Sequence, residues 1–306
     1  MSTALTGARP RPRLRAYWFV YLLVLPAVTY RLFWTAWPLV DTLRLSLTDS
    51  NFIYGTQAYV GFTNFRDLLG DEDFRNSVSI SFVYSVIVVV GTVVLGMGIA
   101  QILSRKLPGQ RFGRVAILLP FTIPTVLAGQ MWRSLATNTG SPINDILLRL
   151  GIIDERIAWL SNAWSARLVI ILASLWRFTP FAAILFVAAL AAVPKDLQEA
   201  AQIDGAGGWK RFRHITFPII SPTVIVVMMF QAIEALRAFD IVYALTKGGP
   251  GTASDVMSYH AYQDMFFYGK SGYGSAQSVV LLVITIISVG VLALWFNRRQ
   301  RRLFSG

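Results

Sequence analysis

Six charged side chains interrupt the long apolar stretches of this 306-residue chain, and these are the residues best placed to do chemistry. They are Arg31, Arg133, Arg177, Glu234, Arg237 and Asp240. A charge at the depth of a lipid bilayer is costly, so such residues usually line a cavity, form a pair or mark a solute pathway. Arg31 and Arg133 lie toward the ends of their apolar stretches, where a long side chain can extend to the lipid headgroups.

Three of these charges fall on one predicted helix. Glu234, Arg237 and Asp240 follow one another at intervals of three residues, so Arg237 can pair with either acid. This spacing leaves two interpretations open. The three residues form a structural ion pair between membrane helices, or their charged groups bind the hydroxyl groups of a polar solute.

Enzymatic chemistry finds little support in the residues. The chain has no cysteine and two histidines, which excludes thiol nucleophiles and Cys-ligated metals and leaves little for a His-built metal site. The HExxH zinc motif and the GxxxxGK[ST] phosphate loop are absent, and the run GAGGWKR at 205–211 has the wrong spacing for such a loop. We interpret His214 and His260 as ordinary surface histidines. The sequence therefore predicts a protein that is no enzyme and holds no metal or cofactor of its own.

The composition predicts a membrane protein. Hydrophobic residues make up 55% of the chain and charged residues 14%, against about 25% charged residues in soluble domains. A spanning helix needs about 20 mostly apolar residues. Six stretches meet this length: 17–40, 79–103, 115–136, 168–193, 222–245 and 276–297. They are too long for barrel strands, so we predict an all-α polytopic protein with six transmembrane helices and a single membrane domain over residues 1–306.

Basic residues are concentrated on one side of this predicted topology. Sixteen Arg and Lys residues fall in the two termini and in the second and fourth connections, against eight in the other three connections. An excess of Lys and Arg marks the cytoplasmic side, so both termini and the connection 194–220 are predicted to be cytoplasmic. The net charge of +12 therefore indicates a lipid bilayer rather than a nucleic acid. The basic N-terminus is also typical of a signal peptide, but no small-residue cleavage site follows, so we predict a retained first helix.

The connection 194–220 has the pattern of two short helices separated by glycines. Residues 195–203 form helix readily, the glycine-rich run 205–208 ends that helix, and a second, basic segment follows at 209–216. An isolated short helix is marginal in water, so it needs a surface on which to pack. The segment is either a solvated hairpin at the lipid headgroups or an element that docks into the groove of a soluble partner.

The same connection carries a family resemblance. The run EAA at 199–201 is followed by Gly205 within DGA, and then by Phe212, Ile215 and Pro218. This pattern resembles the EAA loop of binding-protein-dependent ABC importer permeases. Three other runs resemble the sugar-transporting subclass of that family: VGFTNFRDLL at 60–69, ILLPFTIPT at 117–125 and FDIVYALTKGGPG at 239–251. Together the runs are similar to the first membrane subunit of the maltose, lactose and glycerol-phosphate permease group.

The resemblance implies the type I ABC importer permease architecture and a set of partners. These are a second permease subunit, two cytoplasmic ATPase subunits that bind ATP and Mg²⁺, and an extracytoplasmic solute-binding protein. In that family the first EAA helix fits a cleft of the ATPase and couples ATP-driven closure to the spans. The ATPase-coupling residues that the resemblance implies are Glu199, Ala200, Ala201, Asp204 and Gly205. Small alanines allow close approach, and the Glu199 carboxylate can accept a charge-assisted hydrogen bond.

The resemblance also implies a solute pathway, found by counting from the EAA run and from the GGP run at 248–250. The implied residues are Phe121, Ser174, Arg177, Phe178, Phe181, Gln231, Glu234, Ala235 and Ala238. This set suits a sugar or polyol, because aromatic faces stack on C–H groups while amide and charged groups bind hydroxyls. Some relatives carry Asn or Tyr where this chain has Ala235, Ala238 and Phe121, so the particular sugar is not implied.

We therefore predict the permease subunit of an ATP-driven carbohydrate importer in the bacterial inner membrane. Two alternatives remain open. The same architecture can import a glycerol-phosphate-type solute, which a lone arginine favours and Glu234 beside it disfavours. The chain can also be a secondary transporter driven by an ion gradient, although no inverted repeat is visible between 17–137 and 168–297 and such a transporter has no use for an EAA loop.

Overall fold

The computed structural model describes residues 18–105, 110–137 and 140–304. Five helices in this part of the chain are long and apolar enough to cross a membrane. They are α1 (Trp18–Ser46), α3 (Glu72–Leu103), α7 (Ala163–Ala191), α10 (Phe217–Leu236) and α13 (Ser271–Phe304). A further candidate span is a bent pair, in which α4 (Gln110–Thr122) and α5 (Thr125–Ala136) meet at 98°. The basic residues at 9–15 and Lys106, which contribute to the predicted orientation, lie outside the described residues.

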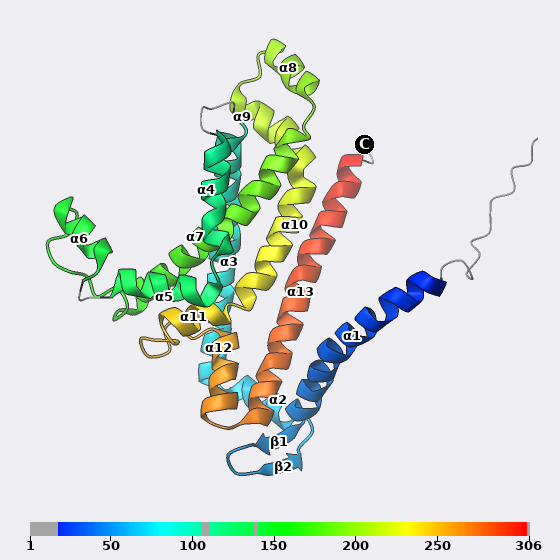
Figure 1. Ribbon diagram of the computed structural model, residues 1–306, viewed down its shortest axis with the longest axis vertical. Helices are drawn as coiled ribbons and strands as arrows, with labels where there is room; N and C mark the ends of the chain where they lie inside the picture. The colour runs from blue at the N-terminus through cyan, green and yellow to red at the C-terminus, as the bar shows by residue number, and fades with distance from the viewer. Residues whose placement is uncertain (1–17, 106–109, 138–139, 305–306) are drawn as a thin grey trace, which may run out of the picture.

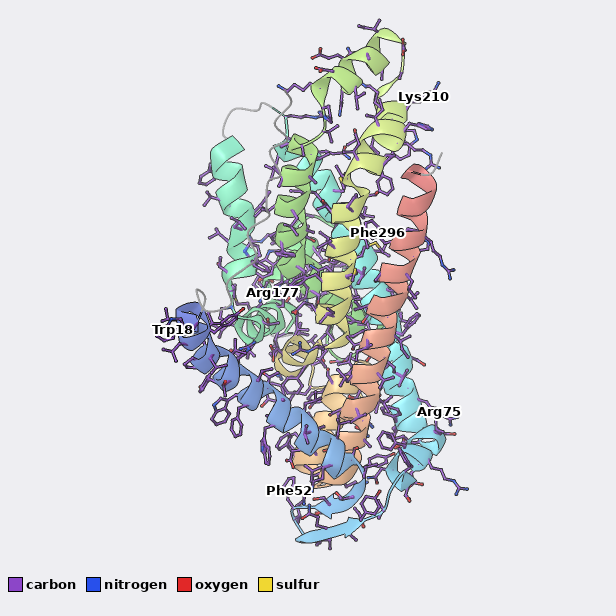
Figure 2. The ribbon with its side chains drawn as sticks, turned by 90° about the vertical axis from the view of Figure 1, so that its right-hand side faces the viewer. Trp18, Phe52, Arg75, Arg177, Lys210 and Phe296 are labelled. Carbon is purple, nitrogen blue, oxygen red and sulfur yellow. The ribbon has the colours of Figure 1, made fainter. Side chains whose placement is uncertain are left out.

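Four of the long helices, α3, α7, α10 and α13, run along the long axis of the molecule, and α6 (Pro142–Arg149) projects to one side between its two ends (Figure 1). The end that we call the α8 end carries α8 (Lys195–Ile203) and α9 (Gly208–Arg211), and α13 finishes near it. The opposite end, which we call the hairpin end, carries β1 (Thr48–Asn51), β2 (Thr56–Tyr59), α2 (Thr63–Gly70) and α12 (Met257–Tyr262). Figure 2 labels Lys210 at the first end and Phe52 at the second, with Arg177 between them.

Helix α1 stands apart from the other spans. It diverges from α13 toward its own N-terminal end (Figure 1), and every residue from 21 to 40 is exposed. Its main contacts are with α13 and β1. The structure therefore leaves the apolar surface of α1 to surroundings outside this chain.

The span predicted at 115–136 is broken into two helices. Helix α4 ends at Thr122 and α5 begins at Thr125. Pro124 lies at the break, where it offers no backbone N–H and disfavours helical geometry at the preceding Ile123. The sequence prediction of a single helix here was wrong, and the break turns α5 sharply away from the direction of α4.

The span predicted at 222–245 is interrupted as well. Helix α10 ends at Leu236, and α11 (Phe239–Leu245) follows after two residues that contain neither proline nor glycine. Helix α11 then packs on α5, where an added Cβ at Gly129 would lie 2.7 Å from the Cβ of Ala244. The close approach at Gly129 shows that this interruption serves tertiary packing rather than a local breaking signal.

Several helices extend beyond the predicted spans, because a helix need not stop at the edge of the hydrocarbon. Helix α3 begins at Glu72 instead of residue 79, since the Asp71 carboxylate caps it by accepting a hydrogen bond of 3.1 Å from the Phe74 N–H. Glu72 and Asp73 in its first turn also suit the helix dipole. The apolar pattern therefore marks the middle of each span better than its ends.

The chain is mostly helical, as predicted, and β1 and β2 form one short pair of strands. The two strands are antiparallel, with Thr48 opposite Tyr59. The Asn51 side-chain oxygen accepts hydrogen bonds from the N–H groups of Ile53 and Tyr54 at 3.0 and 3.2 Å, which stabilises the turn between the strands. This short hairpin does not alter the helical architecture of the spans.

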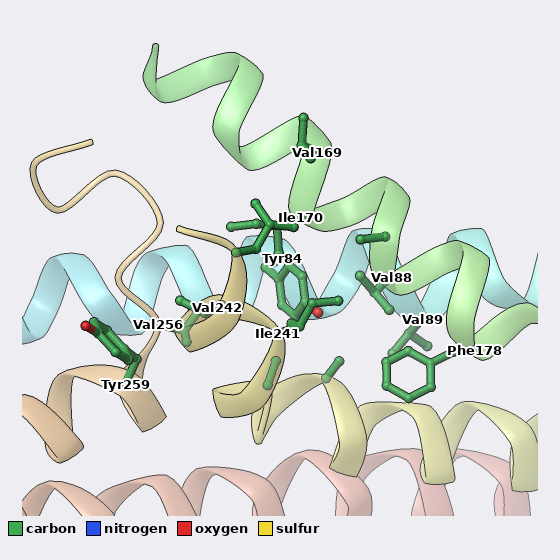
Figure 3. Packing of buried hydrophobic residues seen from close by; sticks show 14 of the residues in the cluster. Tyr84, Val88, Val89, Val169, Ile170, Phe178, Ile241, Val242, Val256 and Tyr259 are labelled. Atoms are coloured by element: carbon green, nitrogen blue, oxygen red, sulfur yellow. The ribbon is translucent and has the colours of Figure 1, made fainter. Parts of the chain in front are cut away.

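Helices α3, α7 and α10 form the centre of the bundle, and small residues let two of them approach closely. An added Cβ at Gly96 of α3 would lie 2.8 Å from the Cβ of Ala182 on α7. One buried cluster contains side chains from α3, α7, α10 and α11, and Figure 3 shows Tyr84, Phe178 and Ile241 within it. This packed centre fixes the faces that the spans turn outward.

A buried polar network holds the hairpin end together, and it includes His260. The His260 Nδ1 lies 2.7 Å from Asp255 Oδ2, and its Nε2 lies 3.7 Å from Asp264 Oδ2. The Tyr273 hydroxyl donates to Asp71 at 2.7 Å nearby. Only 13% of the His260 side chain is exposed, so the prediction of an ordinary surface histidine was wrong. The sequence could not show this burial, because Asp71, at the start of α3, lies far from His260 along the chain and joins it only in the folded protein.

The stability of this network is expected to depend on pH through His260. Burial alone lowers the pKa of an imidazole, but the hydrogen bond and charge of Asp255, with the charges of Asp264 and Asp71, raise the pKa of His260. A raised folded-state pKa stabilises the protein below the unfolded value of about 6.5, and this contribution is lost as the pH rises through the folded value. Lys247 and Lys270 line the same pocket.

We predict that the thermal unfolding midpoint of the purified protein falls as the pH rises from about 6 to 9. His260→Gln should lower the midpoint at the acidic end and flatten the decline, because it keeps a hydrogen-bonding side chain and removes the titrating charge. The difference between wild type and variant cancels the titration of other groups. A variant with the same pH slope as wild type would contradict the assignment.

Candidate functional site

The guanidinium of Arg177 joins α7 to the broken span midway between the two ends of the molecule (Figure 2). Its Nε donates to Thr125 Oγ1 at 3.0 Å, and its Nη1 donates to the Phe121 carbonyl at 3.1 Å. The last carbonyls of a helix lack donors from within the helix, and Pro124 has no N–H to supply. Arg177 therefore donates hydrogen bonds both to the end of α4 and to the start of α5.

Three phenylalanine rings form a partly exposed surface beside Arg177, which we call the aromatic face: Phe121, Phe181 and Phe230. The Phe121 and Phe181 rings stack with centroids 5.4 Å apart, and the Phe181 and Phe230 rings are 4.6 Å apart. The Arg177 guanidinium lies over the Phe121 ring, 5.6 Å from its centroid. Sequence reasoning missed Phe230, which lies one position before the predicted Gln231 and turns to a different face of α10.

Two acidic residues of the α10–α11 segment, Glu234 and Asp240, lie close enough to Arg177 for their charges to act on it. Within the described residues, no ion pair joins Arg237 to either acid, although their spacing permits one. Glu234 is half-buried, whereas Arg237 and Asp240 are exposed. The electrostatic relation therefore runs between α7 and the α10–α11 segment rather than along one helix.

Five of the predicted pathway residues point into the interior of this chain. They are Ser174, Phe178, Gln231, Ala235 and Ala238. The Ser174 hydroxyl lies 2.7 Å from the Tyr84 hydroxyl, so it belongs to the contact between α3 and α7. Phe178, Ala235 and Ala238 are part of the buried hydrophobic cluster. Counting along the sequence gave the helix and the depth of these residues but not the face.

Gln231 is fully buried, and neither its amide oxygen nor its nitrogen has a hydrogen-bond partner within the described part of the chain. Leaving a buried polar group unpaired costs about 1–3 kcal/mol per group. Gln231 precedes Glu234 by one helical turn on α10. Its placement links the buried interior to the polar region around Arg177.

The predicted coupling segment forms a helix with a defined end. At its C-terminus the Gly205 N–H donates to the Gln202 carbonyl at 3.1 Å, and the Ala206 N–H donates to the Ala201 carbonyl at 2.9 Å. This is the hydrogen-bond pattern of a Schellman motif, which needs a left-handed residue at the first position after the cap. Gly205 meets that need with a φ of +75°.

Helix α8 has no buried residue in this chain. Glu199, Ala200 and Asp204 are exposed, as is Ile203 with 87% of its surface accessible. Two side-chain hydrogen bonds attach α8 to the following segment, from Gln198 to Thr216 and from Arg211 to Gln202. The exposed Leu197 and Ile203 give α8 an apolar surface that no other part of the described chain covers.

The segment after α8 continues directly into the span. Helix α9 passes through a π-helical turn (Phe212–Thr216) into α10, so the helix runs without a gap from Gly208 to Leu236. Pro218 and Pro222 do not separate the two, although the sequence was interpreted as a segment at 209–216 followed by a separate span at 222–245. Pro218 lies in the first turn of α10, and Pro222 is accommodated within the helix. The π-helical turn changes the spacing of the backbone hydrogen bonds of the helix just before the prolines.

No cluster of three or more His, Cys, Asp or Glu side chains suited to a metal ion occurs within residues 18–105, 110–137 and 140–304. The polar groups at mid-depth are instead suited to hydrogen bonding, and the rings beside them are suited to stacking. This combination can bind a solute that carries both hydroxyl groups and apolar C–H faces.

Comparison with known families and proteins agrees with this architecture. The family model described as the binding-protein-dependent transport system inner membrane component matches residues 92–303. The trehalose/maltose transport system permease protein MalF of Thermococcus litoralis is 34% identical over 92% of this chain and 94% of its own length. The sn-glycerol-3-phosphate permease protein UgpA of Agrobacterium fabrum is 32% identical over 94% of this chain and 96% of its own. The trehalose permease protein SugA of Mycobacterium tuberculosis is 32% identical, with coverage of 90% and 86%.

The same architecture occurs in a solved structure. The crystal structure of a bacterial ABC transporter that imports the acidic polysaccharide alginate contains a chain with a TM-score of 0.79 and 21% identity, covering 95% of this chain and 98% of that one. The resemblance drawn from the EAA run and the three other motifs is thus confirmed. The chain belongs to the binding-protein-dependent permeases of ABC importers, the multi-pass inner membrane subunits that provide the transport path and perform no catalysis themselves.

Proposed function

We propose that this chain is one of two permease subunits of an ATP-driven importer for a sugar or a sugar-like polyol. The observation that carries the proposal is the aromatic face beside Arg177 and Glu234 at mid-length of the helices. Ring faces accept the C–H surface of a sugar, and the charged groups bind its hydroxyls. The permease relatives that transport trehalose, maltose and glycerol phosphate support this class of solute.

The aromatic face is only one wall of the proposed pathway. Phe230 and Glu234 lie on α10, Phe181 and Arg177 on α7, and Phe121 at the break of the third span. All five are at least partly exposed in the single chain. We propose that the second permease subunit supplies the facing wall, so that the solute is enclosed only in the assembled complex.

The proposed coupling site is the exposed surface of α8. Glu199, Ala200, Ala201, Asp204 and Gly205 would enter a cleft of the ATPase subunit. Ile203 and Leu197, which sequence reasoning did not single out, add exposed apolar groups to that surface. This assignment places the α8 end and both termini in the cytoplasm, and the hairpin end toward the solute-binding protein.

A glycerol-phosphate-type solute is the second candidate, because Arg177 is a cation beside the aromatic face and one relative is a glycerol-3-phosphate permease. Glu234 disfavours it, since a second negative charge would be repelled at this site. Uptake by proteoliposomes that hold the complete complex and its binding protein distinguishes the two. Competition of labelled trehalose uptake by neutral sugars, and not by glycerol 3-phosphate, would favour the sugar.

We predict that Glu234→Gln weakens the apparent affinity for solute by about 1–2 kcal/mol, the difference between a charged and a neutral hydrogen bond. The assembled complex should form in normal yield, because Glu234 has no ion-pair partner in this chain closer than 4.0 Å among the described residues. Arg237→Gln, one turn away and exposed, is the matched control and should transport normally. A loss of yield that the double variant restores, with unchanged affinity, would assign Glu234 to structure instead.

We predict that Phe230→Leu raises the apparent KM for solute by a factor of about 2–10, because ring stacking contributes about 0.5–1.5 kcal/mol beyond buried area. Leucine keeps an apolar side chain on α10 and removes the flat ring. Phe82→Leu is the matched control, since Phe82 is exposed on α3 and makes no ring contact with the aromatic face. Equal KM values for wild type and Phe230→Leu would remove this ring from the pathway.

We predict that Gly205→Val uncouples transport from ATP hydrolysis while the protein remains in the membrane. A β-branched residue at a φ of +75° is strained by about 1–3 kcal/mol, so the end of α8 should unwind. Gly205→Asn tolerates this conformation better and should keep most of the coupling. Gly207→Ala, at a φ of −63°, should behave as wild type. The measurement is ATPase stimulation of the reconstituted complex by loaded binding protein, and full stimulation of the valine variant would contradict the proposed role.

A further inference from the structure

A lateral cavity of about 230 Å³ opens between α3 and α7 toward the hairpin end, outside the proposed solute pathway. Its walls come from α3, α7, α11 and the connection that follows α11. The lining includes Asn76, Val83, Tyr84, Arg167, Ile170 and Val242. None of these belongs to the aromatic face or to the coupling segment, so the proposed function leaves the cavity unexplained.

The deep wall of the cavity is apolar and firmly held. Tyr84, Ile170, Val242 and Val256 are all buried members of the central cluster, and Figure 3 shows them close together. The Tyr84 hydroxyl is held by its contact with Ser174. These side chains form a preformed apolar surface rather than a gap that closes by rearrangement.

The outer wall belongs to a face of α3 that no part of the described chain covers. Val83 is 57% exposed, and the exposed residues Phe82, Val86, Ile87 and Val90 continue this face along the helix. An uncharged surface of this kind on a membrane helix lies against lipid chains. The cavity is therefore continuous with the surface that the bilayer contacts.

The rim of the cavity is polar and cationic. The Arg167 Nε donates to the Ala253 carbonyl at 2.5 Å, and the Asn76 amide donates to Thr252 Oγ1 at 3.3 Å. A guanidinium has five N–H donors, so this contact leaves four for a further acceptor. Both rim residues are exposed. Their geometry matches an anionic, oxygen-rich group seated above an apolar chain.

The rim lies at the level where lipid headgroups are expected. Glu72, Asp73 and Arg75 occupy the first turn of α3, and no charged residue follows on that helix, so the water boundary falls close to Asn76. On α7, Trp164 is exposed one turn before Arg167, as tryptophans commonly are at the membrane interface. Two independent helices thus place the same boundary at the same rim.

We propose that this cavity binds a single phospholipid, with an acyl chain against Val83 and Ile170 and the phosphate at Arg167 and Asn76. The lipid would fill the space between α3 and α7 and brace the connection 246–256, which both rim residues already contact. This proposal depends on the membrane location of the chain and not on the identity of the solute.

The test uses the complete complex reconstituted with phosphatidylglycerol that carries a diazirine on its acyl chain. Photolysis should label wild-type peptides that contain Ile170–Ile171, which line the cavity away from the exposed face of α3, and excess unlabelled phosphatidylglycerol should compete. Arg167→Gln should lower this labelling about tenfold. Val83→Trp should abolish it by filling the cavity, while leaving the rim intact. Val83 is exposed, so Val83→Trp should not disturb the fold. It therefore keeps the test valid if Arg167→Gln loosens the connection 246–256.

Arg75→Gln is the matched control, since Arg75 is an exposed cation at the same end of the molecule but pairs with Glu72 at 3.7 Å. It should retain wild-type labelling. The proposal is overturned if wild-type labelling is absent, if both cavity variants label as wild type, or if Arg75→Gln reduces labelling as much as Arg167→Gln. Protection of the same peptides by the second permease subunit, without lipid labelling, would show that protein covers the cavity.

Discussion

The arrangement of the spans depends on how one cation is satisfied inside an apolar bundle. Arg177 is placed where an unpaired charge would be costly, and it finds acceptors in the carbonyl of Phe121 and the hydroxyl of Thr125. Those acceptors exist because Pro124 interrupts the third span and leaves helix ends without internal partners. The charge and the break therefore stabilise each other: the break provides acceptors, and the guanidinium holds the two helix ends in place. Helix α5 can then turn across the bundle and receive α11 at Gly129.

Around this contact the chain separates into a packed centre and surfaces that it leaves open. The close approach of α3 and α7 at Gly96 and the buried cluster beyond it supply the rigid part. Helix α8, helix α1 and the exposed side of α3 have few or no partners within the described chain. A subunit that works only in an assembly is expected to divide in this way, since its exposed apolar surfaces are the ones that other molecules cover.

Sequence reasoning located the middle of the spans and the family, and its errors have physical causes. Hydropathy measures apolar length, and it cannot tell a proline that breaks a helix from one that does not. Pro26, Pro38 and Pro180 lie within intact helices, whereas Pro124 ends one. Contacts with neighbouring helices and polar side chains decide whether a proline breaks its helix, and hydropathy does not show these tertiary contacts.

The site residues show the same limit. Counting from a motif fixes how deep a residue lies along its helix, and it selected Arg177, Phe181 and Glu234, which are partly exposed in the structure. Counting does not fix which face of the helix a residue occupies, so Ser174 and Ala235 proved to be interior while Phe230 was missed. A helical wheel cannot settle the question in a span that contacts other helices or lipid on every side, because all of its faces are apolar.

The continuity of α9 with α10 gives the proposed coupling a physical route. A helix that runs unbroken for 29 residues, from Gly208 to Leu236, is about 43 Å long at 1.5 Å per residue and moves largely as one body. Its first turns are tied to α8 through Arg211 and Gln202, and its last turns carry Phe230 and Glu234. A displacement of α8 by the ATPase would therefore shift the aromatic wall directly, without a chain of small rearrangements between the two sites. The π-helical turn at 212–216 is an irregularity along this route, where a rotation of the short helices relative to the span would be absorbed.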